Sequence, residues 1–162
     1  MTHDELVIRA ERWLKSMGCG VVFNDRFRAA THSGEQPDAI GWRDGLSILV
    51  ECKATRGDFL ADKKKPFRVA SSLGMGDWRF MMCPPGMIAP DELPAGWGLL
   101  YVHHKKVEKA HGVPTNCQWW TKKPSEGNKR IETQVMYSAL RRLSIRGHFE
   151  TIYEPITTGG EA

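Results

Sequence analysis

The sequence predicts an α/β fold, and three features of the 162-residue chain indicate it. Residues 2–17 place apolar side chains at the 3.6-residue spacing of an amphipathic helix. Asp44-Gly45 separates two apolar runs, which is the strongest short-range signal for a β-hairpin. Two further apolar runs, 78–83 and 98–103, follow a short helical segment, and a second amphipathic pattern closes the chain. Helical and strand segments thus alternate as they do in α/β proteins.

The elements are justified in chain order by their start and stop signals. Gly18 and Gly20 end the first helix, and residues 21–23 form a short strand. The hairpin strands occupy residues 37–42 and 47–55.

A short helix over residues 56–65 follows the hairpin, and Pro66 is expected to stop it. The rest of the chain predicts strands at 78–83, 98–103 and 105–111, irregular structure at 113–127, and a closing helix at 128–146. We expect one domain over residues 1–153 and a flexible C-terminal tail over residues 154–162.

Composition narrows the class of protein. A hydrophobic content of 41% and a charged content of 26% are typical of a soluble globular protein. No apolar stretch approaches the ~20 residues of a membrane span, and the N-terminus lacks a signal-peptide pattern, so a cytoplasmic protein without membrane contact is expected. The four cysteines form no C-x-x-C pair, which argues against a zinc ribbon or a redox motif.

The hairpin carries the residues with the clearest chemical meaning. If Asp44-Gly45 forms a two-residue turn, Asp38 lies directly opposite Glu51 on the neighbouring strand. Lys53 shares a face of the sheet with Glu51, because side chains two apart on a strand point the same way. Opposed carboxylates destabilise a sheet unless a cation offsets them, and a divalent metal is the natural one. A surface hairpin with scattered charges is the alternative, because a one-residue slip would invert every side chain.

The same residues resemble a known enzyme signature. Pro37-Asp38, followed by Glu51-Cys52-Lys53, is similar to the motif of the PD-(D/E)XK nuclease superfamily. The longer stretch 48–63 resembles the active-site region of MmcB-like DNA repair proteins and related phage proteins, and a weaker similarity extends to about residue 102. Cys52 departs from the small apolar residue usual in those proteins, but its side chain is expected to face away from the site.

The resemblance implies a fold and a chemistry. The fold is a restriction-endonuclease-like αβββαβ core with a central mixed sheet flanked by helices, plus a C-terminal helix. The implied function is a metal-dependent DNA nuclease of DNA repair or phage DNA processing. The alternatives are a non-cleaving DNA-binding module and an RNA-directed nuclease. Dimers are common in the superfamily, so a homodimer is compatible with the resemblance.

The implied site is built around Mg²⁺, with Mn²⁺ as a plausible substitute. Asp38, Glu51 and the backbone carbonyl of Cys52 would hold the metal, and Lys53 would stabilise the attacking water or the developing negative charge.

Similar nucleases often add an acidic residue, and this chain offers Glu5, Glu11 and Glu35. Glu5 is favoured because it lies at the start of the first helix. Its other role is structural, since Thr2 and Glu5 have the spacing of a capping box.

Basic residues follow the proposed site strand directly. A net charge of +4 permits nucleic-acid binding, and the cluster after Lys53 is expected to contact DNA phosphates. Its members are Arg56, Lys63, Lys64, Lys65 and Arg68. The sequence assigns no chemical role to the six histidines, and it interprets Asp62 as a charge that offsets nearby lysines.

Overall fold

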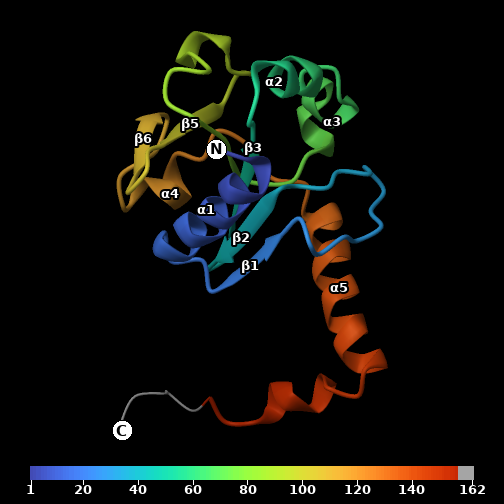
Figure 1. The fold of residues 1–162 in the computed structure, drawn as a ribbon. Coiled ribbons are helices and arrows are strands. Elements are labelled where there is room, and N and C mark those ends of the chain that lie inside the picture. Colours follow the sequence, from blue (N-terminus) through green and yellow to red (C-terminus); the bar gives the residue numbers. More distant parts are fainter. Residues whose placement is uncertain (157–162) are drawn as a thin grey trace, which may run out of the picture.

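The structure is a computed structural model that describes residues 1–156. A six-stranded sheet forms its centre, with helices against both faces (Figure 1). The strands are β1 (Val21–Asn24), β2 (Ala39–Arg43), β3 (Leu46–Cys52), β4 (Trp78–Cys83), β5 (Trp97–Val102) and β6 (Val107–His111). The α-helices are α1 (His3–Ser16), α2 (Arg56–Asp62), α3 (Pro66–Val69), α4 (Gln118–Thr121) and α5 (Lys129–Ile145). Short 3₁₀ helices lie at Ser71–Leu73, Pro90–Glu92 and Phe149–Tyr153.

The sheet is mixed, and its strands lie in sequence order from β1 to β6. Strands β1, β2 and β3 pair antiparallel, β3, β4 and β5 pair parallel, and β6 returns antiparallel along β5. The predicted α/β class, the central mixed sheet and the C-terminal helix are therefore confirmed. Strand β3 changes partner direction because β2 reaches it through a tight turn, whereas β4 reaches it through α2 and α3.

The turn between β2 and β3 has the geometry that its two residues favour. Asp44 and Gly45 both have positive φ, at 44° and 75°, as a type I′ hairpin turn requires. The register runs from Arg43 opposite Leu46 to Ala39 opposite Val50. The predicted pairing is confirmed over these five residue pairs, and Asp38 directly precedes the last of them.

The two faces of the sheet carry separate apolar layers. Helix α1 packs its buried residues, including Leu6 and Leu14, against Val50 and Phe80. The opposite face places Leu49 with residues of α2 and of the first turns of α5. Because side chains alternate along β3, Glu51 shares the second face with Leu49.

Two local expectations differ from the structure. Pro66 begins α3 as its first residue, because proline has no N–H to lose there and its φ already suits a helix. Residues 113–127, expected to be irregular, contain α4, whose Trp119 packs edge-on against Trp78. Within residues 1–156, no helix has both the length and the hydrophobicity needed to cross a membrane. The predicted tail lies outside the described residues from position 157 onward.

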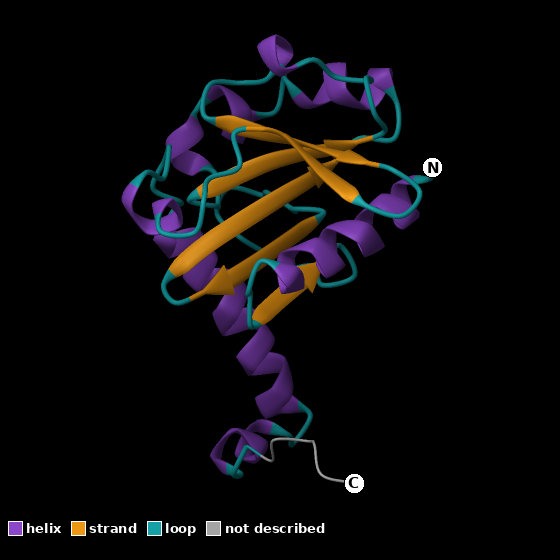
Figure 2. Ribbon diagram, turned by 90° about the vertical axis from the view of Figure 1, so that its left-hand side faces the viewer, coloured by secondary structure: helices purple, strands orange, loops and turns teal. Residues whose placement is uncertain are grey.

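Helix α5 is most deeply buried near its start. Both ribbon views show its second half and the following 3₁₀ helix extending away from the sheet (Figures 1 and 2). Ile131 and Val135 in the first turns are buried, whereas Leu140 is 45% and Ile145 is 69% exposed. The predicted apolar side of this helix is therefore fully buried only in its first two turns, whereas Arg142 of a later turn lies over the Phe27 ring at 4.4 Å.

Candidate active site

Asp38 lies just before β2, beside the end of β3. One oxygen of its carboxylate accepts a hydrogen bond from the backbone N–H of Cys52 at 2.7 Å. This bond holds the carboxylate next to the residue that follows Glu51. Burial and, after it, the negative charge of Glu51 together raise the pKa of Asp38 to about 6. The two carboxylates are therefore close enough to interact, as the hairpin register predicts.

Glu51 and Lys53 lie side by side at the end of β3. The Lys53 ammonium is 3.4 Å from Glu51 Oε2, and the side chains are 5% and 3% exposed. Burial alone would lower the pKa of Lys53, but the charges of Glu51 and Asp62 outweigh it and raise the pKa. Lys53 is therefore a charged ammonium in a nearly closed site.

A buried ion-pair network surrounds this pair. Lys53 also donates to Asp62 of α2 at 3.1 Å, and Asp62 receives the Nε–H of Arg68 at 2.7 Å. The Arg68 guanidinium lies 3.0 Å from Glu51 Oε1 and 3.1 Å from Glu35. Arg68 therefore connects three carboxylates from a loop, β3 and α2.

Lys53, Asp62 and Arg68 keep their charges because they neutralise one another. Burial would raise the pKa of Asp62, yet Arg68 and Lys53 lower it to about 2. Glu35 differs, because burial dominates over Arg68 and raises its pKa. The Nη2 atom of Arg68 lies near Glu51 but has no partner in hydrogen-bond geometry. Charge, more than directional bonding, thus holds Arg68 against Glu51.

Two residues that the sequence interpretation left without a role lie against Asp38. His3 Nε2 is 3.3 Å from Asp38 Oδ1 and 3.7 Å from Asp25 Oδ2. One ligand atom from each of the three residues fits within a 4.8 Å cluster. The position of Asp25 follows from the pairing of β1 with β2. Asn24 lies opposite Ala39, so Asp25, the next residue, lies near Asp38. The position of His3 cannot be predicted in this way, because it depends on how α1 packs.

The three candidates for an additional acid occupy different places. Glu5 closes the capping box: its carboxylate accepts the Thr2 N–H at 2.7 Å, and its own N–H donates to the Thr2 hydroxyl. Glu11 pairs with Lys15 and accepts a bond from Asn24. Only Glu35 joins the network around Glu51, through Arg68.

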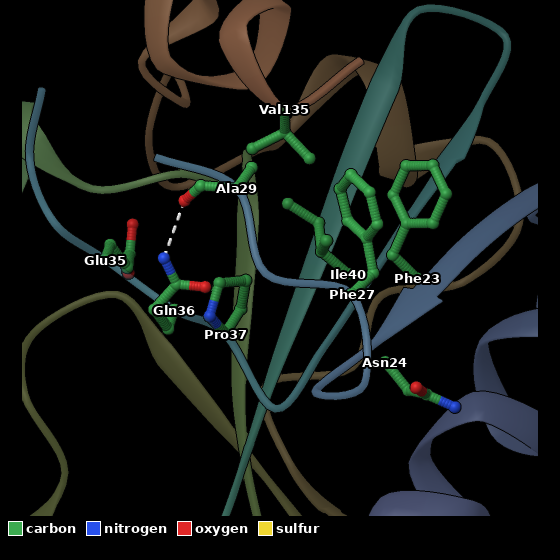
Figure 3. Close-up of a pocket in the computed structure, with 9 residues that line it drawn as sticks. All are labelled: Phe23, Asn24, Phe27, Ala29, Glu35, Gln36, Pro37, Ile40 and Val135. Carbon is green, nitrogen blue, oxygen red and sulfur yellow. Dashed lines mark hydrogen bonds between the residues drawn. The ribbon is translucent and has the colours of Figure 1, made fainter. Parts of the chain in front are cut away.

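The loop that carries Glu35 is packed rather than open. Gln36 donates to the carbonyl of Ala29 at 2.7 Å, and Figure 3 shows Ile40, Phe23 and Phe27 grouped on one side of this bond. The cavity among these residues has a volume of about 10 Å³, which leaves room for at most one water molecule. It is too small for a ligand, so the loop serves to hold Glu35 and Asp38 in place.

The predicted phosphate-binding residues are largely engaged within the protein. Arg56 pairs with Glu92, and Lys65 pairs with Asp62 at 2.9 Å. The Arg68 side chain is 2% exposed, because Pro66 turns the chain and α3 packs this side chain inward. Lys63 and Lys64 are exposed on the surface.

The residues around Asp38 are suitable for a divalent cation. In the described chain, no lysine or arginine lies within salt-bridge distance of the Asp38 carboxylate, which has only His3 as a basic partner. Burial and, after it, the negative charge of Glu51 raise the pKa of this carboxyl, and a bound metal ion would offset the acidic charge. Carboxylate and carbonyl oxygens suit Mg²⁺, and an imidazole nearby extends the choice to Mn²⁺.

Comparisons with known proteins bear on the fold. Neither a scan against protein families nor a search of curated proteins finds a match for this sequence. A solved structure of a protein of unknown function from Silicibacter pomeroyi is similar to this chain, with 23% sequence identity and a TM-score of 0.59. The alignment covers 98% of this chain and 97% of the other. It supports the fold over essentially the whole chain.

Proposed function

We propose that this protein is a metal-dependent DNA nuclease, active in DNA repair or phage DNA processing. One observation supports it most: Asp38 and Glu51 come together from neighbouring strands, and the Lys53 ammonium lies 3.4 Å from Glu51. Two acids and one ammonium are the groups that metal-assisted cleavage of a phosphodiester needs. The resemblance to PD-(D/E)XK nucleases rests on the same three residues.

In this proposal Asp38, Glu51 and the carbonyl of Cys52 hold Mg²⁺. When bound, the metal would supply an activated water and a Lewis acid for the phosphoryl oxygens. Lys53 is fixed between Glu51 and Asp62, so its charge is available beside the reacting phosphate. Because Arg68 occupies one oxygen of Glu51, metal binding must displace or share this contact.

A non-cleaving DNA-binding module is the second candidate function. The observation that favours it is the burial of Glu51 and Lys53, which leaves these groups little access to solvent. A binder would use the surface of the fold and leave this network as a structural element. The two candidates differ in whether a metal produces cleavage.

The test is cleavage by the purified protein. Single-stranded, duplex, flapped and branched DNA, together with single-stranded RNA, are incubated with Mg²⁺, Mn²⁺ or EDTA. We expect metal-dependent cleavage of DNA. The Lys53→Met variant, which keeps the length of the side chain, should lose on the order of 10²-fold in rate and still bind DNA.

Lys122→Met is the control, because it removes an exposed lysine that lies outside the cluster assigned to phosphate binding. Thermal unfolding of both variants shows that the domain remains folded. If DNA is bound but not cleaved with either metal, the nuclease proposal is replaced by the binding module. Preferential cleavage of RNA would change the substrate and leave the chemistry unchanged.

A further inference from the structure

A shallow groove of about 330 Å³ between α1 and the β5–β6 turn is lined by basic side chains. Trp13, Ser16 and Met17 form part of its floor and walls. Its cations are Arg9, Arg12, Lys105, Lys106 and Lys109, which we call the basic groove. None of these five residues belongs to the cluster that the sequence analysis assigned to phosphate binding.

The groove follows from local geometry. Arg9 and Arg12 are three residues apart on α1 and therefore share one face of the helix. Lys105 and Lys106 form the turn before the edge strand β6, and Lys109 lies on that strand. Arg9 donates to the carbonyl of His104 at 3.0 Å, which holds the helix beside the turn.

The basic groove lacks internal counter-charges. Among residues 1–156, no carboxylate comes within 4 Å of any of its five cationic groups. The cluster after Lys53 differs, because Arg56, Lys65 and Arg68 each pair with a carboxylate. Five cations along one groove repel one another, and a bound polyanion would remove that repulsion.

The groove continues toward the N-terminal end of α1. Arg9 and Arg12 also line a second hollow of about 440 Å³, which extends along α1 to Glu5 and Met1. His3 lies in the same first turn of α1 and is 3.3 Å from Asp38. A chain of phosphates lying along α1 would therefore reach the end of the helix that carries His3.

We propose that the basic groove binds the sugar-phosphate backbone of a nucleic acid and directs it along α1 toward Asp38. The identity of the polyanion rests on the proposed function, whereas the location of the surface does not depend on cleavage. Trp13 is buried, so the contacts come from charged groups and not from base stacking. Binding should therefore be insensitive to sequence and sensitive to salt.

The test measures binding without cleavage. Fluorescence anisotropy of a labelled DNA duplex and of a single strand is followed in EDTA while salt rises from about 50 to about 200 mM. The groove variant combines Arg12→Glu with Lys106→Glu, both at exposed positions. The control variant combines Lys63→Glu with Lys64→Glu, which reverses two exposed cations outside the groove.

The groove variant should bind DNA about 10- to 100-fold more weakly, and the slope of log K against log salt should fall by about 2. The control variant should change less in both respects. An unchanged slope in the groove variant, or a larger loss in the control variant, overturns the proposal. So does equal binding of a poly-glutamate competitor, which would identify an acidic peptide as the preferred partner.

These outcomes are separable from those of the proposed function. If the wild-type protein binds DNA through the groove but never cleaves it, the groove stands and the nuclease proposal fails. If the groove variant binds and cleaves DNA like the wild type, the nuclease proposal stands and the groove fails. Absence of any DNA binding by the wild type at the lowest salt also overturns the groove.

Discussion

The carboxylate form of Asp38 is destabilised in the candidate site. Its carboxyl is buried and faces Glu51, which together raise its pKa to about 6 from an ordinary value near 4. The folded protein therefore binds this proton more tightly than the unfolded chain does. The contribution of the protonated group to stability is fully present below about pH 4 and is lost as the pH rises through about 6.

We predict that Asp38→Asn stabilises the metal-free protein at neutral pH. The shift corresponds to at most about 3 kcal/mol, and the asparagine oxygen can still accept the Cys52 N–H. Urea unfolding in EDTA should show a gain of about 1 to 3 kcal/mol near pH 7.5 and little gain near pH 4.

Asp25→Asn provides the control for this measurement. Its carboxylate also faces His3 but is 36% exposed, so its effect on unfolding should be smaller. Destabilisation of the Asp38→Asn variant at neutral pH would mean that the Asp38 carboxylate has a structural role, and that a metal ion is not needed to offset its charge.

The residues around Glu51 show what sequence reasoning reached at this scale. The position of Asp38 relative to Glu51 followed from the Asp44-Gly45 turn and from the alternation of side chains along a strand. Rules about neighbouring residues were therefore sufficient to predict it. Arg68 was expected on the surface, because the sequence shows that it is basic but does not show which carboxylates it contacts in the fold. Glu35 and Asp62 meet it from separate elements, which only the packed fold brings together.

At the scale of elements, a second buried polar network fixes α5 to the sheet. Glu132 of α5 accepts hydrogen bonds from the Ser47 hydroxyl at 2.7 Å and from the N–H of Gly76 at 2.9 Å. Asp77 accepts from the N–H groups of Ser47 and Gly127, at 3.0 and 2.8 Å. These bonds explain why α5 stays in place although its second half is exposed.

We predict that Asp77→Ala strongly destabilises the fold. The substitution leaves the two buried N–H groups without their acceptor, and it leaves the Lys129 ammonium with Glu132 as its carboxylate partner. The expected loss in the free energy of unfolding is about 3 to 5 kcal/mol, measured by urea denaturation.

Glu126→Ala is the matched control for Asp77→Ala. Glu126 also pairs with a lysine, Lys123 at 2.8 Å, but its side chain is 66% exposed. Removing it should change stability by no more than about 1 kcal/mol. Equal losses in the two variants would show that Asp77 contributes no more than a surface ion pair.

Element prediction succeeded where the signals were local. The helix start at Asn128 and the turn at Asp44-Gly45 depend on residues that cap a helix or favour a tight turn. Both occur as expected. Helix α4 was missed, because Trp119 is stabilised there by packing against Trp78, some forty positions away in the chain.

At the scale of the whole molecule, the chain divides into a packed body and a projecting C-terminal segment (Figure 1). The segment after α5 has little buried surface: Ile152 is 50% and Tyr153 is 73% exposed. Side chains that remain in water add little to the free energy of folding. The body should therefore fold without this segment.

We predict that a chain ending at Gly147 keeps its fold. Its melting temperature, measured by circular dichroism, should lie within about 4 °C of that of the full chain, since residues 148–156 bury little apolar surface. A chain ending at Asn128 is the contrast, because it loses Glu132 and the buried start of α5 and should fail to fold cooperatively. A large loss in the chain ending at Gly147 would reveal contacts of the C-terminal segment that matter for stability.

Strand β3 pairs antiparallel with β2 and parallel with β4, and this difference determines which pairing can form first during folding. The β2–β3 hairpin closes over two residues and can form within about 10 μs, whereas the parallel β3–β4 pairing must wait for the whole intervening crossover. Asp38 and Glu51 therefore meet early, before the segment that carries Arg68 arrives to shield them. In the newly formed hairpin the Asp38 and Glu51 carboxylates repel each other without a neighbouring cation. We therefore expect mild acidity or dissolved divalent cations to speed the formation of the hairpin.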